Sequence, residues 1–286
     1  MQVITSKDNE IVKQIKKLKE KKYRDEAGVY VIEGIKMLEE AINENASIEK
    51  IVICEDCSDS GIIPQKLMYT IAKYDCIYVS KKVFEILTDV VAPQGILAVI
   101  REPAKDEKID YNTDLILALD GIQDPGNLGT ILRTADSVNL KQIIVTKNTA
   151  DCFNPKVVRS TMGAILRIKV IETDSLVKTL KEAKKNKFEI VATSLDTENS
   201  IYDIDYNKKV IVIGNEANGV TKEVQKMADN NEKELRARLE PVLEEETSQT
   251  IADIKNGVIS ENVKLLMFNE LADMQPISLS ETYFLL

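Results

Sequence analysis

Short runs rich in Val, Ile and Leu recur along the sequence, and stretches with helical periodicity lie between several of them. Strands that are aliphatic over their whole length are buried on both faces, and such strands separated by helices are typical of a parallel sheet covered on both sides. The sequence therefore predicts an α/β fold. The clearest strand candidates are Lys50–Cys54, Ile96–Ile100, Leu115–Asp120, Gln142–Thr146, Phe188–Ala192 and Val210–Gly214, and the clearest helix candidates are Ile35–Ile42, Gly129–Val138 and Ser175–Lys185.

One polar segment divides this pattern. Arg101–Thr113 is rich in charged residues and contains a proline, which is typical of a linker between domains. We therefore expect a small α/β domain over residues 1–100, a linker over 101–113 and a second α/β domain over 114–227. Residues 228–286 are charged and helix-prone, and nothing in them continues the strand–helix pattern, so we expect an acidic helical tail there.

Charge is distributed unevenly along the chain. The net charge is −9, and residues 228–286 hold 12 acidic and five basic side chains. Residues 1–24 hold eight Lys or Arg and only three acidic residues. An acidic total argues against a nonspecific coat on nucleic acid, but the basic start is suited to local contacts with phosphates.

The sequence contains no histidine, which excludes Ser-His-Asp hydrolysis and His-ligated metal sites. Four cysteines are present, and Cys54-Glu-Asp-Cys57 has CxxC spacing without a second such pair. It follows a strand-like run rather than opening a helix of the redox type, so we interpret these thiols as structural and expect no metal. No apolar run approaches the ~20 residues that span a bilayer, and the polar N-terminus predicts a cytoplasmic protein.

Three loops follow predicted strands, where open α/β sheets bind ligands. In the first, a strand runs into Asp120-Gly121, and a new helix opens near Asn127 after Asp124-Pro125-Gly126. Free N–H groups at a helix start favour an anion. Neither GxGxxG nor the P-loop pattern occurs, so neither NAD nor ATP is indicated. Arg133 follows six residues after Asn127; the simpler alternative for it is a surface cation paired with an acid.

The second loop, Asn154–Ala164, has Arg159-Ser160 placed to hold a phosphate, or forms an ordinary helix with a basic face. In the third, a fully apolar strand ends in Gly214-Asn215-Glu216, and Asn218-Gly219 follows. Glu216 is placed to accept hydrogen bonds from hydroxyl or amine groups of a ligand. The alternative is a plain turn, since Asn-Gly is a common turn dipeptide.

In this order, Asn-x-Gly-x-x-x-Arg, NPKVVRSxxGA and IxGNExxGV resemble the motifs of the SpoU/TrmH family of RNA ribose 2′-O-methyltransferases in the SPOUT superfamily. Ile4-Thr5-Ser6, Lys16-Lys17-Leu18 and Val31-Ile32-Glu33-Gly34 resemble the family's N-terminal substrate-binding domain. The resemblance covers residues 3–227. It implies an RNA-binding domain followed by a Rossmann-like parallel-sheet SPOUT domain with a trefoil knot, and a homodimer.

The resemblance also implies the reaction and its residues. S-adenosylmethionine would methylate a ribose 2′-hydroxyl in rRNA or tRNA. Arg133 would be catalytic, either as general base or as electrostatic stabiliser, and Asn127 would position Arg133 and the ribose. Gly214, Asn215, Glu216 and Gly219 would line the cofactor pocket. The implied RNA contacts are Lys13, Lys16, Lys17, Lys21, Arg24, Arg159 and Ser160.

One family signature is missing from the sequence. The family closes with a strand reaching Ile-Pro-Met and then Ser-Leu-Asn-Val, and the nearest echo, Ser260–Val263, lies too far downstream. Two alternatives therefore stand beside the enzyme. One is a catalytically impaired RNA-binding module derived from a methyltransferase, and the other is a regulatory protein whose acidic tail docks a partner or covers the basic region.

Overall fold

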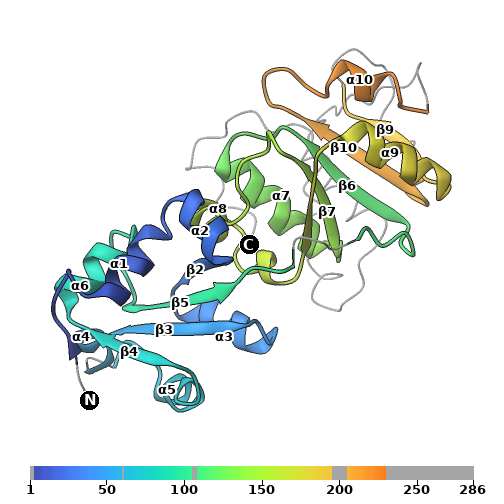
Figure 1. The fold of residues 1–286 in the computed structure, drawn as a ribbon. Coiled ribbons are helices and arrows are strands. Elements are labelled where there is room, and N and C mark those ends of the chain that lie inside the picture. The colour runs from blue at the N-terminus through green and yellow to red at the C-terminus, as the bar shows by residue number, and fades with distance from the viewer. Residues whose placement is uncertain (1–2, 60, 105–107, 195–204, 230–286) are drawn as a thin grey trace, which may run out of the picture. The chain divides into compact units, whose positions relative to one another are not determined.

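The computed structural model describes residues 3–59, 61–104, 108–194 and 205–229. The chain forms two compact units (Figure 1). Unit 1 combines the chain up to Ala104 with the segment Asp151–Arg167, and unit 2 contains the remainder. Unit 1 therefore holds a segment that the chain reaches only after it has entered unit 2.

Unit 1 is built on a five-stranded sheet in the order β1-β4-β3-β5-β2. Strand β4 runs parallel to β1 and β3, whereas β5 runs antiparallel to β3 and β2. The sheet is therefore mixed, and the predicted strand at Ile96–Ile100 is antiparallel to its neighbours. Burial on both faces made this strand uniformly apolar, and burial carries no information on strand direction. The bounds are β1 Val3–Ile4, β2 Val29–Glu33, β3 Ile48–Cys54, β4 Cys76–Val79 and β5 Ile96–Arg101.

Helices of unit 1 pack on this sheet through apolar residues spaced three or four positions apart. Helix α1 is capped by Asn9, whose side chain accepts hydrogen bonds from two backbone N–H groups of the first turn. Val12 and Ile15 of α1 join the core beside β3 and α6, so the opposite face of α1 is left to lysines. The bounds are α1 Glu10–Lys17, α2 Lys21–Ala27, α3 Ile35–Asn43, α4 Glu55–Asp59, α5 Gln65–Ile71, α6 Lys81–Leu87, α8 Pro155–Ser160 and the 3₁₀ turn Ala164–Leu166.

The paired cysteines of unit 1 lie where β3 gives way to α4. Cys54 ends the strand and Cys57 lies within the helix, so the pair does lead into a helix, contrary to the sequence-based expectation. None of these four cysteines, all of which lie in the described ranges, forms a disulfide. Burial and the neighbouring Cys54 raise the pKa of Cys57 to about 11. A thiol with a raised pKa is protonated at neutral pH and therefore unreactive, in agreement with a structural role.

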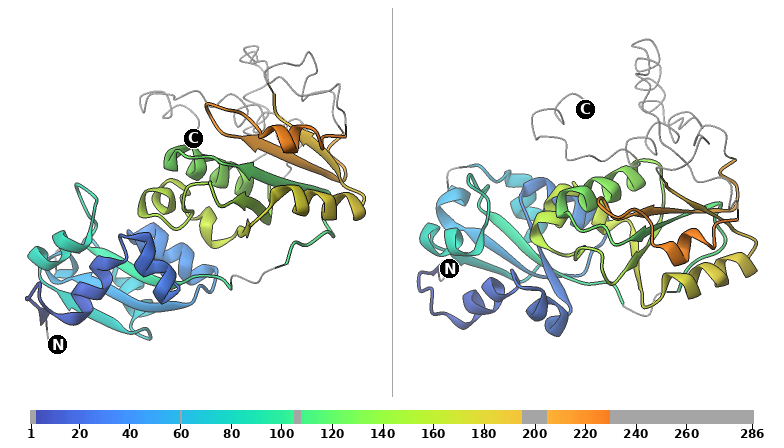
Figure 2. Two further views of the ribbon diagram at one scale, coloured as in Figure 1. Left: turned by 45° about the horizontal axis from the view of Figure 1, so that its top comes forward. Right: turned by 90° about the horizontal axis from the view of Figure 1, so that it is seen from above.

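Unit 2 contains a five-stranded, fully parallel sheet in the order β8-β7-β6-β10-β9. Helices α9 and α10 pack on one face of this sheet and α7 lies on the other (Figure 2). The predicted α/β architecture with a doubly covered parallel sheet is confirmed in this unit. The bounds are β6 Leu115–Asp120, β7 Gln142–Thr146, β8 Lys169–Thr173, β9 Glu189–Ala192 and β10 Lys209–Gly214, with α7 Pro125–Ser137, α9 Leu176–Lys185 and α10 Lys222–Gln225.

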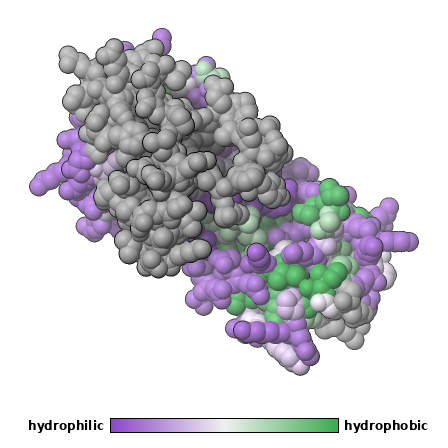
Figure 3. All heavy atoms as spheres, turned by 180° about the vertical axis from the view of Figure 1, so that it is seen from behind, coloured by the Kyte–Doolittle hydropathy of each residue, from purple (hydrophilic) through white to green (hydrophobic). Residues whose placement is uncertain are grey.

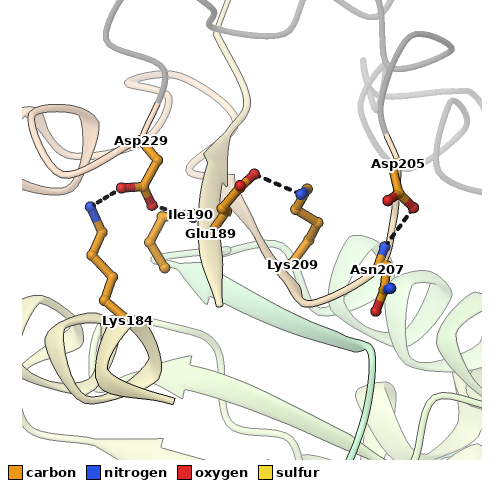
Figure 4. A network of polar contacts seen from close by, with 7 residues as sticks. All are labelled: Lys184, Glu189, Ile190, Asp205, Asn207, Lys209 and Asp229. Carbon is orange, nitrogen blue, oxygen red and sulfur yellow. Dashed lines mark hydrogen bonds and ion pairs between the residues drawn. The ribbon is translucent and has the colours of Figure 1, made fainter. Parts of the chain in front are cut away.

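The end of the described chain is fastened to edge strand β9. Asp229 accepts a hydrogen bond from the backbone N–H of Ile190 at 2.9 Å and pairs with Lys184 at 2.6 Å (Figure 4). Lys209 on β10 pairs with Glu189 on β9 at 2.6 Å. The hydrogen bond between Asp229 and Ile190 occupies part of the edge of β9 that faces away from β10. The expected tail lies outside the described residues from residue 230 onward.

None of the helices in the described ranges is long and apolar enough to cross a membrane.

Candidate active site at the ends of β6 and β10

Strands β6 and β10 end side by side in the middle of the parallel sheet. Their register pairs Asp120 with Gly214, the last residue of each strand. Asp120 is only 7% exposed, and its carboxylate accepts a hydrogen bond from the backbone N–H of Thr221 at 2.8 Å. The loop after β10 is thereby fastened to the end of β6. Sequence analysis did not single out Asp120 or Thr221 for this role, although Asp120 closed a predicted strand.

The loop after β10 folds back tightly on itself. Asn215 and Gly219 exchange backbone hydrogen bonds of 3.0 and 2.8 Å, and the Asn215 side chain donates to the carbonyl of Gly121 at 2.9 Å. A Cβ atom on Gly214 would lie 2.0 Å from the backbone nitrogen of Val220. Only glycine fits this close approach. The residues from Glu216 to Gly219 are exposed on the surface of this turn.

Glu216 joins this turn to the loop after β6. Its carboxylate accepts hydrogen bonds from the backbone N–H groups of Gln123 and Asp124, at 3.3 and 3.4 Å, and from the side-chain amide of Asn127 at 3.2 Å. The predicted residues Asn127, Asn215 and Glu216 therefore do come together. The sequence did not reveal that Glu216 bonds within the protein, because its partners lie about ninety positions away in the chain.

Helix α7 begins at this junction and carries Arg133. Asp124 caps the helix, accepting a hydrogen bond from the Asn127 N–H at 2.8 Å, and Pro125 occupies the first turn. Arg133 is half-buried on α7. Within the described parts of the chain, its guanidinium makes no hydrogen bond or ion pair. A half-buried cation whose guanidinium has no partner among the described residues is suited to an anionic group of a ligand.

Exposed lysines line the outer side of α1 and α2 in unit 1. Lys13 pairs with Glu10, three residues earlier, at 3.3 Å. The ammonium of Lys17 lies over the ring of Tyr23 at 5.3 Å, and Lys22 lies over the same ring at 5.7 Å. The four predicted RNA contacts that are exposed here are Lys13, Lys16, Lys17 and Lys21.

The structure contradicts the prediction that Arg24 contacts RNA. Its side chain is 2% exposed, so it is not available to a phosphate on the surface. It donates to the carbonyl of Leu18 at 2.7 Å and forms an ion pair with Asp151, while its Nε has no partner within the described residues. The ion pair offsets the desolvation cost of burying the Arg24 charge. We therefore interpret Arg24 as a structural residue.

The other two predicted RNA contacts lie on α8. The hydroxyl of Ser160 donates back to the helix, to the carbonyls of Lys156 at 3.1 Å and Val157 at 2.9 Å. Arg159 is half-buried beside Glu33, and its charge acts to lower the pKa of that carboxyl, although burial raises it overall. The structure thus places Arg159 in unit 1, together with the lysines of α1 and α2.

Comparisons with known proteins match both units. The model of the SpoU rRNA Methylase family matches residues 114–233, and the model of the MRM3-like substrate binding domain matches residues 9–98. The chain is similar to 23S rRNA (guanosine(2553)-2′-O)-methyltransferase RlmP of Bacillus subtilis. The two are 32% identical over 232 residues, which is 81% of this chain and 89% of that protein.

Solved structures agree with these matches. The AdoMet-bound rRNA methyltransferase of Sinorhizobium meliloti is 26% identical, with a TM-score of 0.70 over 91% of this chain and 99% of that one. A TrmH-family RNA methyltransferase of Porphyromonas gingivalis is also 26% identical, with a TM-score of 0.67 over 84% of this chain and 94% of that one.

Proposed function

The chain belongs to the SpoU rRNA methylase family, and from that membership we propose which of its residues carry out the family's reaction. It is an S-adenosylmethionine-dependent RNA ribose 2′-O-methyltransferase. The observation that best supports the assignment is the set of hydrogen bonds that the Glu216 carboxylate accepts from Asp124 and Asn127. These bonds hold the turn after β10 against the start of α7. The alternative of an RNA-binding module without catalysis is not favoured.

The turn after β10 fits the cofactor. Its backbone is held rigid by Asn215 and lies at the carboxyl edge of a parallel sheet, where nucleotide-like ligands bind. A Cβ at Gly219 would meet no atom within 4 Å, so this side of the turn is open. Gly214, Asn215 and Gly219 would hold S-adenosylmethionine, which supplies an electrophilic methyl group. Glu216 supports the turn from behind through its bonds to the loop after β6.

Arg133 acts on the ribose. The 2′-hydroxyl is a weak nucleophile, and negative charge develops on its oxygen as the methyl group transfers. Guanidinium groups stay protonated in proteins, so Arg133 would serve as a fixed positive charge near that oxygen. The hydroxyl proton would pass to solvent water as the O–CH3 bond forms, and the bond between the methyl group and the cofactor sulfur would break to leave S-adenosylhomocysteine. Asn127, oriented by Glu216, positions the ribose at the start of α7.

Residues 1–100 would bind RNA, and the second domain would carry out the methyl transfer. The exposed lysines of α1 and α2 bind phosphates, which positions RNA without reading its sequence. The polar segment 101–113 links this domain to the catalytic domain at 114–227, of which the segment Asp151–Arg167 packs within unit 1. The substrate is rRNA, which the Bacillus subtilis relative's name also specifies for that protein. The family resemblance further supports a homodimer, a trefoil knot, action in the cytoplasm and independence of metal, and all four are proposals.

Substitution of Arg133 tests the assignment. We expect Arg133→Ala to lower the rate of methyl transfer by about 100-fold or more, because the developing charge loses its counterion. Calorimetric titration with S-adenosylmethionine should give the same Kd as the wild type, since the turn after β10 is unchanged. Lys141→Ala, which removes an exposed cation elsewhere in unit 2, is the matched control and should leave both quantities unchanged. Full activity of Arg133→Ala would show that another residue acts on the hydroxyl.

A further inference from the structure

A loop between α6 and β5 projects from unit 1. In the left view of Figure 2 this teal loop stands away from the rest of the unit. We call residues 88–94 the tip loop. Its Val91 is 104% exposed, the highest value among the exposed large hydrophobic residues of the described chain. Unit 1 also shows apolar side chains in patches among hydrophilic ones (Figure 3).

The first end of the tip loop is held by polar contacts. The hydroxyl of Thr88 donates to the Glu33 carboxylate and accepts a hydrogen bond from the Val90 N–H at 2.9 Å. Lys19 donates to the Thr88 carbonyl at 3.1 Å and pairs with Asp89 at 2.7 Å. The loop therefore starts from a fixed position beside the end of α1.

The second end is held as firmly. The side-chain oxygen of Gln94 accepts a hydrogen bond from the backbone N–H of Ile35 at 2.8 Å, and the Gly95 carbonyl accepts one from Cys54 at 2.8 Å. A Cβ on Gly95 would lie 2.3 Å from the Cβ of Cys57, so the chain is closely packed there. A loop that is fixed at both ends and exposes an apolar side chain is pre-organised for a contact.

The surroundings of the tip loop indicate the chemistry of the partner. Lys19 contacts the loop directly. Lys16 and Lys17, at the end of α1, precede Lys19 by three and two residues. Arg159 interacts electrostatically with Glu33, whose carboxylate accepts the hydrogen bond from Thr88. An apolar tip flanked by cations suits nucleic acid, in which phosphates alternate with flat, apolar base faces.

We propose that the tip loop is a second RNA contact of unit 1, in which Val91 packs against the base or ribose of an unpaired nucleotide while Lys16, Lys17 and Arg159 bind the flanking phosphates. This inference rests on the proposed function and adds a site to it. Unpaired nucleotides are the parts of RNA whose base faces are accessible to side chains. The tip loop thus helps to select RNA that presents such a nucleotide.

Binding measurements on neutral variants test this contact. The probe is an unmodified, fluorescently labelled transcript of 23S rRNA around guanosine 2553, the position named for the Bacillus subtilis relative. We expect Val91→Ser to raise the Kd about five- to tenfold, because the apolar contact is lost. The slope of log Kd against log salt should stay unchanged for Val91→Ser and fall by about one for Lys16→Met, which loses a phosphate contact.

Two controls keep the outcomes separate. Ile62→Ser removes another exposed apolar side chain of unit 1, 50% exposed, and should bind the transcript like the wild type. S-adenosylmethionine should bind Val91→Ser and the wild type equally. An unchanged Kd for Val91→Ser would overturn the tip-loop contact and leave the proposed function standing. A wild type that binds the transcript through Val91 but transfers no methyl group would overturn the proposed function and leave the contact standing.

Discussion

At the scale of single residues, two glycines of one turn have opposite surroundings. A Cβ on Gly214 would lie 2.0 Å from a backbone nitrogen, whereas a Cβ on Gly219 would meet nothing within 4 Å. We expect Gly214→Ala to lower the free energy of unfolding by about 3 kcal/mol or more, because backbone must move. Gly219→Ala should cost only about 1 kcal/mol, the penalty for its positive φ of 67°. Urea unfolding measures both, and equal losses would contradict the close approach at Gly214.

Residue identity was easier to predict than residue contacts. Asn127, Asn215 and Glu216 were singled out from the sequence and do come together, because each follows a strand or opens a helix at one edge of the sheet. The sequence did not predict that Glu216 would accept hydrogen bonds from the protein itself rather than from a ligand. Arg24 shows why: it was expected on the surface, but its burial depends on Asp151, 127 positions later in the chain.

At the scale of elements, the Arg24–Asp151 ion pair ties α2 to the segment Asp151–Arg167 within unit 1. We expect Arg24→Met to lower the free energy of unfolding of the full chain by about 3 kcal/mol, because Asp151 loses its counterion in a largely buried site. Lys16→Met, at an exposed position, should stay within about 0.5 kcal/mol of the wild type. Circular dichroism during urea titration measures both changes. An Arg24→Met variant as stable as the wild type would show that the ion pair does not stabilise this link.

Element prediction succeeded where strands are buried on both faces. The predicted bounds of β6 and β7 match the structure, because an uninterrupted aliphatic run marks a central parallel strand. Strand β8 was not predicted. It is a half-exposed edge strand that mixes charged and apolar residues, so its sequence lacks that signal. Strand β4 was missed as well, since its four residues are too few to show a period.

At the scale of the whole molecule, basic and acidic regions occupy different parts of the sequence. The basic start belongs to unit 1, where Lys13, Lys16, Lys17 and Lys21 are exposed. Residues 228–286, which lie largely outside the described residues, hold 12 acidic and only five basic side chains. Uneven charge of this kind explains how a chain with a net charge of −9 binds an anionic substrate, because the local field rather than the total charge steers RNA.

The most direct test of the account is to identify the methylated nucleoside. The purified full-length chain is incubated with the unmodified 23S rRNA transcript and isotopically labelled S-adenosylmethionine, and the RNA is digested to nucleosides for mass spectrometry. The account predicts label in a 2′-O-methylated nucleoside with the wild type, and its loss with Arg133→Ala. Label on a base, or equal ribose label with both proteins, would contradict the central claim that Arg133 supports transfer to a ribose 2′-hydroxyl.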